Sequence, residues 1–126
     1  MPAEPLGILL LSGGHERAHY AFMLAAGAAA IGRRVLIFAS NAGCHALIAT
    51  PPGLEPGGAD DAARQAGVAG LTELREAALA LGTRLMACDS GLKLAGLPAA
   101  ALAPGVEITG IPAFLSAVGP GQIVTL

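Results

Sequence analysis

Apolar and polar positions alternate along the chain in a pattern that predicts strands separated by helices. Residues 6–11 form an almost continuous apolar run closed by Ser12-Gly13-Gly14, as expected for a strand buried on both faces and followed by a glycine turn. Further apolar runs predict strands at 35–39, 84–88, 106–109 and 122–126. Five strands that alternate with helices predict an α/β domain with a mostly parallel sheet and helices on both faces.

Helical periodicity is clearest in two segments between these strands. Residues 15–31 and 71–81 carry apolar side chains three and four positions apart, and a glycine follows each segment. In the second segment this spacing places Arg75 on the polar face, together with Glu73 and Glu76. Shorter helices are predicted after an N-cap at Asp89 or Ser90 and through Ala95, at 111–118, and as a single turn at 98–102.

The segment between the second strand and the 71–81 helix has a different composition. Residues 41–50 are expected to form a loop that runs into a short helix, which Pro51-Pro52-Gly53 ends. Residues 54–70 are rich in glycine, proline and aspartate, a composition that favours a mobile surface loop with one helical turn near 61–65. Long loops beside a site often act as lids, so we expect this one to border the functional edge.

Composition bounds the organisation of the protein. The 126 residues suffice for one core and no linker divides them, so a single domain spanning 1–126 is expected. Hydrophobic residues make up 54% of the chain and charged residues only 13%, which leaves little polar surface to cover that core. Because soluble monomers seldom expose large apolar patches, we expect a homo-oligomer.

Charge and hydropathy exclude several classes of partner. The net charge is −2, and the seven Lys and Arg residues do not cluster beyond Arg33-Arg34, so no nucleic acid is expected to bind. The longest apolar stretch, 21–32, is well short of the ~20 residues needed to span a membrane. No basic segment precedes the first apolar run, which argues against a secretion signal. A cytoplasmic protein is therefore expected, with its two cysteines as free thiols or a transient redox pair.

All five cysteine and histidine residues follow one of the first three predicted strands. They are His15, His19, Cys44, His45 and Cys88. Because parallel sheets bind ligands beyond the carboxyl ends of their strands, this placement indicates where the chemistry lies. Cys88 is the main candidate, since a thiolate is a nucleophile and a helix N-terminus stabilises negative charge, although Asp89 beside it adds a negative neighbour. The alternative is that Cys88 is a small buried side chain at the end of a core strand.

Three weaker candidates accompany Cys88. Cys44 could approach it and act as a second thiol, or it could be an unpaired loop thiol, and His45 could be a base or a solvated residue. His15 and His19, four positions apart, could hold a metal with Cys44 or His45, but neither zinc motif is present and no metal is predicted. Ser12-Gly13-Gly14 could cradle an anion, yet the glycine-rich nucleotide motifs are absent, so no cofactor is expected.

The order of these segments resembles the DsrE/DsrF-like family over nearly the whole chain. The most specific part is 71–88, where a strand ends in Ala87-Cys88, and the next helix ends in Gly96-Leu97. The likeness is strongest to the small DsrE-like proteins that are often labelled as peroxiredoxins, although the Pro-x-x-x-Thr-x-x-Cys pattern of a peroxidatic site is absent. The resemblance implies a three-layer, flavodoxin-like doubly wound α/β sandwich and trimeric or hexameric assembly.

The resemblance also implies a function, because the characterised sulfur-relay members carry sulfane sulfur as a persulfide on a cysteine. Carried over to this chain, that cysteine is Cys88. Donor and acceptor proteins for sulfur would then be its partners, and Ser12, Gly13, Gly14, His15, His45, Asp89 and Ser90 are expected to line the pocket. Two alternatives are a non-catalytic module that binds a small ligand or a metal, and an oligomeric scaffold.

Overall fold

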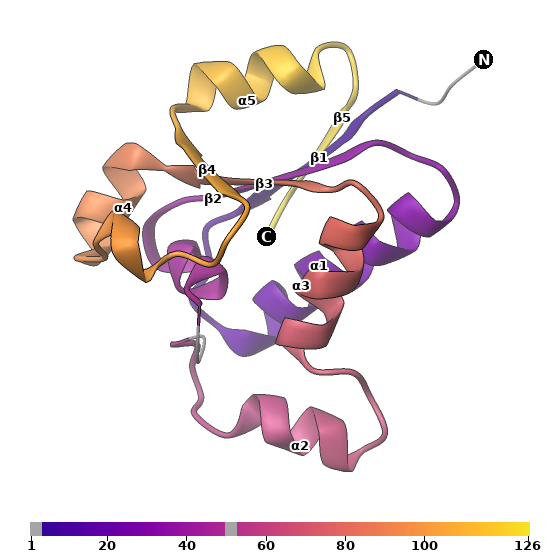
Figure 1. The fold of residues 1–126 in the computed structure, drawn as a ribbon, viewed down its shortest axis with the longest axis vertical. Coiled ribbons are helices and arrows are strands. Elements are labelled where there is room, and N and C mark those ends of the chain that lie inside the picture. Colours follow the sequence, from indigo (N-terminus) through magenta and orange to yellow (C-terminus); the bar gives the residue numbers. More distant parts are fainter. Residues whose placement is uncertain (1–3, 50–52) are drawn as a thin grey trace.

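The computed structural model describes residues 4–49 and 53–126, and Figure 1 shows how their helices and strands are arranged. The elements run in the order β1 (Leu6–Leu10), α1 (His15–Ala30), β2 (Val35–Ala39), the 3₁₀ helix η1 (Asn41–Leu47), α2 (Ala59–Gln65), α3 (Leu71–Ala80), β3 (Arg84–Cys88), α4 (Asp89–Ala95), the 3₁₀ helix η2 (Ala99–Ala101), β4 (Val106–Thr109), α5 (Ile111–Val118) and β5 (Gln122–Thr125).

The five strands form one sheet in the order β4-β3-β2-β1-β5, and all of the pairs are parallel. The chain moves outward from β1 to β4, and α5 then carries it back to β5 on the other side of β1. Because crossovers between parallel strands are right-handed, this reversal of direction places α5 on the face opposite to α1 and α3. Figure 1 shows the three layers, with α5 above the sheet and α1 and α3 below it.

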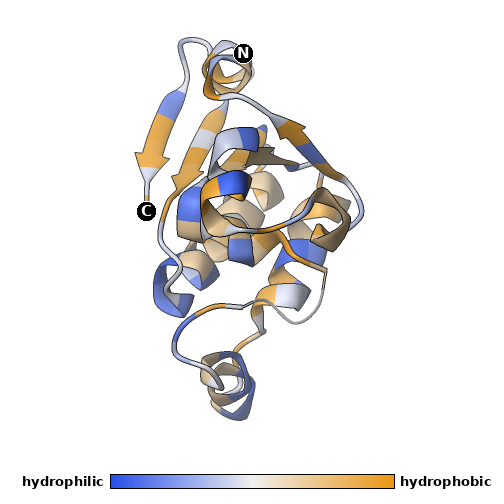
Figure 2. Ribbon diagram, turned by 90° about the vertical axis from the view of Figure 1, so that its left-hand side faces the viewer, coloured by the Kyte–Doolittle hydropathy of each residue, from blue (hydrophilic) through white to orange (hydrophobic). Residues whose placement is uncertain are grey.

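Side chains alternate between two apolar clusters, one on each face of the sheet. The larger cluster joins Leu6, Ile8 and Leu10 of β1 to α1 and α3. The smaller cluster consists of Leu36, Phe38, Met86, Phe114 and Val118, with the rings of Phe38 and Phe114 stacked 5.2 Å apart. Figure 2 shows the hydrophobic strands between the helices, and α2 with hydrophilic residues at the far end of the molecule.

The expected α/β sandwich with a parallel five-stranded sheet is confirmed. Four of the strands and helices, at 35–39, 84–88, 106–109 and 111–118, have the bounds that the sequence predicts. The expected surface loop at 54–70 contains the helix α2, which begins at Ala59, two residues before the predicted turn. The predicted end of the short helix at Pro51-Pro52-Gly53 lies largely outside the described residues.

The prediction for Arg75 is wrong, because this side chain is buried and not on a polar face. Its guanidinium group donates hydrogen bonds to the backbone carbonyls of Ala46 and Ile48 at 2.8 Å and of Ala49 at 3.2 Å. These carbonyls belong to the end of η1 and the residues after it, which α3 thereby holds in place. Burial lowers the pKa of Arg75, and the hydrogen bonds replace the water that the charge has lost.

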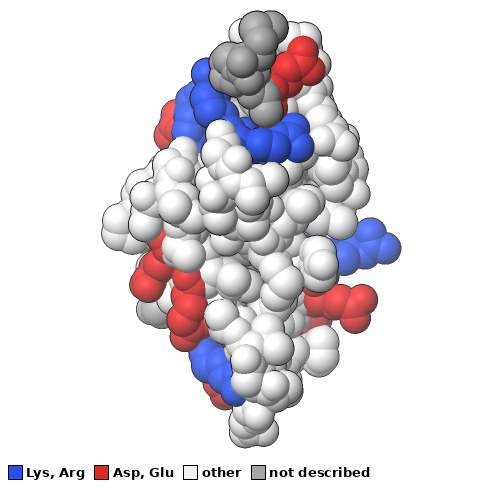
Figure 3. All heavy atoms as spheres, turned by 90° about the vertical axis from the view of Figure 1, so that its right-hand side faces the viewer, with Lys and Arg blue, Asp and Glu red and all other residues white. Residues whose placement is uncertain are grey.

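The surface is short of charge, as the composition requires. Figure 3 shows one face on which charged side chains lie near the upper end and along the two side edges, while the centre of the face is uncharged. Several large apolar side chains are exposed, including Tyr20 at 57% and Ile31 at 80%, both on or next to α1. Within residues 4–49 and 53–126, no helix has the length and apolarity that a membrane crossing requires.

The contact between α5 and β1 gives a first test of the fold. A Cβ atom on Gly7 would lie 2.6 Å from Cγ2 of Val118 and 2.8 Å from Cζ of Phe114, so Gly7→Ala should push α5 off the sheet. We expect a loss of about 1–3 kcal/mol in the free energy of unfolding, measured by urea denaturation. Gly27→Ala is the matched control, since a Cβ there meets nothing within 4 Å, and it should stabilise α1 by about 0.5–1 kcal/mol.

Candidate functional site

Cys88 lies where β3 runs directly into α4. It is the N-cap of α4, and its Sγ accepts a hydrogen bond from the backbone N–H of Gly91 at 3.4 Å. The prediction that Asp89 or Ser90 caps this helix is therefore wrong, because no loop residue separates the strand from the helix and the last strand residue takes the capping position. The thiol is half-buried, and Sγ receives one backbone hydrogen bond.

The position of Cys88 is fixed by close packing of α4 against the end of β2. A Cβ atom on Gly91 would lie 2.5 Å from both the backbone nitrogen of Asn41 and Oγ of Ser40, so only glycine allows α4 to come this close. Asn41 itself has a positive φ of 53°, which turns the chain sharply after β2. The first turn of α4, and with it Cys88, is thereby held at the carboxyl edge of the sheet.

A groove of about 750 Å³ lies over Cys88, on the face of the sheet that α5 covers only in part. Cys88 forms one wall with the start of α4, and the opposite wall is the start of α5. Asp89 and Ser90, which the sequence analysis placed in the pocket, line this groove. Phe38, Ser40, Thr109 and the residues from Gly110 to Pro112 line it too and were missed, because their proximity depends on the strand order. The remaining lining residues are Leu9, Leu11 and Ile108.

Cys44 does not share this groove with Cys88. It lies in η1, is fully buried, and belongs to the larger cluster on the α1 side of the sheet, whereas Cys88 packs with the smaller cluster on the α5 side. Its Sγ donates a hydrogen bond to the carbonyl of Ala39 at 3.6 Å. Burial, and secondly the negative charge of Cys88, raise the pKa of Cys44 to about 11. At neutral pH the Cys44 thiol therefore keeps its proton.

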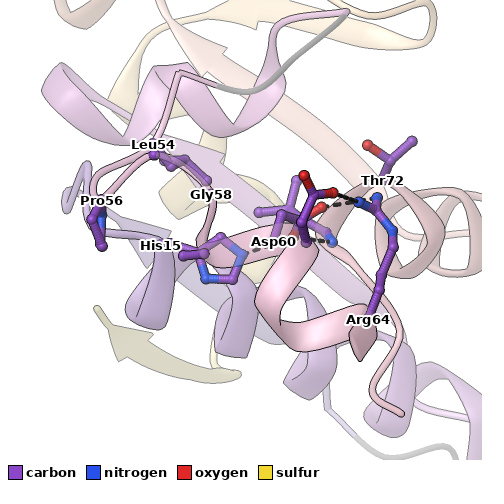
Figure 4. Close-up of a pocket in the computed structure, with 11 residues that line it drawn as sticks. His15, Leu54, Pro56, Gly58, Asp60, Arg64 and Thr72 are labelled. Atoms are coloured by element: carbon purple, nitrogen blue, oxygen red, sulfur yellow. Dashed lines mark hydrogen bonds and ion pairs between the residues drawn. The ribbon is translucent and has the colours of Figure 1, made fainter. Parts of the chain in front are cut away.

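His15 lies away from the Cys88 groove, so the expectation that it lines the same pocket is wrong. The turn after β1 leads into α1 on the other face of the sheet, and His15 begins this helix. Its Nε2 donates a hydrogen bond to Oδ1 of Asp60 in α2 at 2.7 Å. Figure 4 shows the two side chains pointing toward one another beside Arg64. Together with Leu54 and Pro56 they line a separate pocket of about 410 Å³.

Arg64 links α2 to α3 through its ion pair with Glu73 at 3.0 Å, and Asp60 is the second link. Beyond His15, it accepts a hydrogen bond from the backbone N–H of Leu71 at 2.8 Å and forms an ion pair with Arg64 at 2.9 Å. Partial burial alone would raise the pKa of Asp60, but the hydrogen bonds from His15 and Leu71 and the charge of Arg64 outweigh it and lower the pKa. The sequence analysis missed Asp60 and Arg64, although their spacing of four within a helix was a usable signal.

The remaining candidates have structural partners. Nε2 of His19 donates to the carbonyl of Ala69 at 2.8 Å, and its ring stacks on His15 with centroids 5.1 Å apart. Oγ of Ser12 accepts from the N–H of Gly14 at 3.0 Å, and the N–H of His15 donates to the carbonyl of Glu55 at 2.6 Å. The backbone N–H groups of Gly14 and His15 therefore already have acceptors within the protein and are not free to bind an anion.

No cluster of metal-ligating side chains is formed by the residues that the structure describes, whether His, Cys, Asp or Glu is considered. His45 lies in η1, where its Nδ1 is 3.0 Å from the position of a Cβ atom on Gly53. The five cysteine and histidine residues therefore do not gather at one site. Cys88 lines its groove, Cys44 lies in the buried core, His15 and His19 lie near α2, and His45 lies in η1 beside Gly53 and does not line the Cys88 groove.

The fold and the groove define a class of protein: a three-layer α/β sandwich with a half-buried thiol at the carboxyl edge of a parallel sheet. The sequence model of the DsrE/DsrF-like family matches residues 6–125, so the chain belongs to that family, as the segment order predicted. A comparison with curated proteins gave no match.

Two solved structures share this fold. The ychN protein from E. coli matches with a TM-score of 0.75 and 15% identity, over 98% of this chain and 99% of that one. The protein of unknown function MTH1491 from Methanobacterium thermoautotrophicum matches with a TM-score of 0.65 and 14% identity, over the same shares of the two chains. At these identities the likeness shows the fold alone.

The buried thiol of Cys44 predicts a dependence of stability on pH. An unfolded thiol ionises near pH 9.0, whereas burial raises the pKa of Cys44 in the folded protein to about 11, so the folded state binds this proton more tightly. The resulting stabilisation is present below pH 9 and is lost as pH rises to 11, by roughly 2–3 kcal/mol. The unfolding free energy of the wild type, minus that of Cys44→Ala, should fall by this amount between pH 9 and 11, and a flat difference would contradict the assignment.

The contacts of Asp60 predict that this side chain contributes strongly to the placement of α2, because α2 has no buried residue of its own and its other link, the ion pair of Arg64 with Glu73, is exposed. In Asp60→Ala, amide hydrogen exchange over 54–70 should quicken by about tenfold or more, since hydrogen bonds to a charged group are lost. Asp61→Ala is the matched control. Asp61 is 79% exposed and pairs with Arg64 alone, so its loss should leave the exchange of this segment nearly unchanged.

Proposed function

We propose that this protein carries sulfane sulfur as a persulfide on Cys88 and passes it on to an acceptor. Membership of the DsrE/DsrF-like family supports a role related to sulfur relay. The observation that carries the proposal is the environment of Cys88: its thiol lines a groove large enough for a donor, while the protein core closes over Cys44. A carrier needs one accessible thiol and no competing thiol on the same face.

The transfer of sulfur to Cys88 needs a donor persulfide as its co-reactant. The thiolate of Cys88 attacks the outer sulfur of R–S–SH, a new S–S bond forms on Cys88, and the S–S bond of the donor breaks. The donor leaves as RS⁻, and the proton redistributes between RS⁻ and the new persulfide. An acceptor thiolate repeats the same step on the outer sulfur held by Cys88, so the sulfur moves without net oxidation or reduction.

The surroundings of Cys88 suit such an intermediate. The N–H of Gly91 donates a hydrogen bond to Sγ, which places a backbone donor beside the sulfur that would react. The walls of the groove shield the persulfide from bulk thiols, and the open side leaves the outer sulfur within reach of an acceptor. Asp89 lies beside Cys88 but pairs with Lys93 at 3.0 Å, which offsets part of its charge.

Cys44 is not suited to act as a second thiol in this reaction. The side chains of Cys44 and Cys88 belong to clusters on opposite faces of the sheet, and a disulfide requires their Cβ atoms to point toward one another. The raised pKa of Cys44 also keeps it protonated at neutral pH. We therefore assign sulfur transfer to Cys88 alone, with any resolving thiol supplied by the acceptor.

Assembly is part of the proposal. The exposed apolar side chains of α1, together with an open groove of about 380 Å³ that Tyr20, Met23 and Ile31 help to line, support the expected homo-oligomer. A trimer or a hexamer, a cytoplasmic location and protein donors and acceptors remain predictions. A small-molecule binding module is the second candidate function, and the pocket beside His15 and Asp60 favours it.

Intact-protein mass spectrometry tests the sulfur-carrying role. After incubation with a persulfide donor, the wild type should gain one sulfur, about 32 Da, which dithiothreitol removes. Cys44→Ala should gain the same mass, because its buried thiol takes no part, and Cys88→Ser should gain none. Reaction of the native protein with a thiol reagent serves as a control: Cys88 should react at once and Cys44 only after unfolding.

Two outcomes would contradict the proposal. If no form of the protein gains sulfur from several donors, Cys88 is not a carrier and the binding module becomes the better candidate. If Cys88→Ser gains sulfur as fast as the wild type while it keeps the fold, the reactive thiol is Cys44.

A further inference from the structure

The groove over Cys88 contains no cationic side chain among the residues that line it. Its volume of about 750 Å³ lies in the ordinary range for small-molecule sites, roughly 300–1,000 Å³. The polar side chains that line it, apart from the thiol, are two serines, one threonine and one aspartate. Its apolar lining residues are Leu9, Leu11, Phe38, Ile108, Ile111 and Pro112.

The charged groups nearest to Cys88 in the sequence do not supply a free positive charge. Asp89 lines the groove, and its Oδ2 lies 3.0 Å from Nζ of Lys93, one helical turn further along α4. Both side chains are largely exposed, at 58% and 77%, so the pair is solvated and weak. A ligand in the groove therefore meets a carboxylate whose charge Lys93 offsets only in part, and no lining cation that could bind an anionic group.

The rim of the groove is apolar and exposed. Leu11, Ile108 and Ile111 line it and are 42%, 44% and 41% exposed. A carbon chain laid against these side chains would remove apolar surface from water, which is favourable. A carboxylate in the same place would lose hydration and would find no cation among the lining side chains to offset that loss, which is costly. Both effects favour an uncharged, apolar ligand over an anionic one.

We propose that the Cys88 groove takes its sulfur from a persulfide with an uncharged, aliphatic carbon skeleton, in preference to an anionic carrier. This inference rests on the proposed function, because it names the donor class for the same thiol. The outer sulfur of the donor moves to Sγ of Cys88, the donor S–S bond breaks, and the carrier leaves as its thiolate. Small donors with carboxylates in the carrier are then poor substrates, because no cation lines the groove to pair with their charges.

A matched pair of donors tests this preference. The persulfides of N-acetylcysteine and of N-acetylcysteine methyl ester, generated in situ, differ in one carboxylate and present the same reactive sulfur. The rate of sulfur addition to Cys88 in the full-length protein is followed by mass spectrometry. Each rate is divided by the rate for Cys44→Ala unfolded in urea, which corrects for the intrinsic reactivity of each donor. The folded protein should favour the ester by about tenfold or more at low salt.

Charge variants on α4 show whether the groove sets this preference. Asp89→Asn frees the charge of Lys93, so it should raise the corrected rate ratio of acid to ester by about threefold. Lys93→Gln leaves Asp89 unpaired, so it should lower the same ratio, and added salt should shrink both changes. Glu16→Gln, which also removes one negative charge but lies on α1 against the other face of the sheet, should leave the ratio unchanged.

The outcomes separate this inference from the proposed function. If both donors load Cys88 and the corrected rates are equal, or the acid is faster, the preference is refuted while the persulfide carrier stands. If neither donor loads Cys88, the carrier role fails and the inference fails with it. If the ester is favoured but Asp89→Asn and Lys93→Gln leave the ratio at the wild-type value, the preference does not arise from the groove, which also overturns the proposal.

Discussion

The packing of α5 on Gly7 is the contact on which the second face of the sheet depends. Because a glycine stands under Phe114 and Val118, a single helix can cover β1 and β2 at close range. The helix is short and lies over the middle of the sheet, so the carboxyl edge near β3 and β4 stays uncovered. The groove over Cys88 is the space that remains. Fold stability and access to the thiol thus follow from the same placement of α5.

The two thiols pack in different apolar clusters. Cys88 ends a strand, and alternation of side chains along β3 turns it toward the α5 face. Cys44 follows β2 in a tight 3₁₀ helix that turns inward to the α1 face. The Cys88 thiol is therefore partly exposed to solvent and accepts a hydrogen bond from a backbone N–H. The Cys44 thiol is surrounded by the core and keeps its proton at neutral pH. The same type of side chain therefore stands in two different environments, one half-buried beside a groove and one fully buried in the core.

Local pattern predicted most of the elements, and tertiary contacts decided the exceptions. The strands at 35–39 and 84–88 are short, apolar and bounded by glycine or charge, so neighbouring residues suffice to define them. Arg75 was misplaced because helical spacing puts it on the polar face, and only the carbonyls of Ala46, Ile48 and Ala49 make its burial favourable. The histidines were misassigned for a similar reason: the acceptor for His15, Asp60, lies 45 positions away.

The sequence by itself determined the alternation of strands and helices, the family, and the placement of Cys88 at a strand end, because each depends on residues close together in the chain. It could not determine which strand ends become neighbours. The order β4-β3-β2-β1-β5 brings Thr109 and the start of α5 beside Cys88 and leaves His15 on the other face. That order is decided by packing between distant segments, since the direction of the chain after β4 fixes which face α5 covers. The groove, its apolar walls and its lack of a cation therefore belong to the tertiary structure.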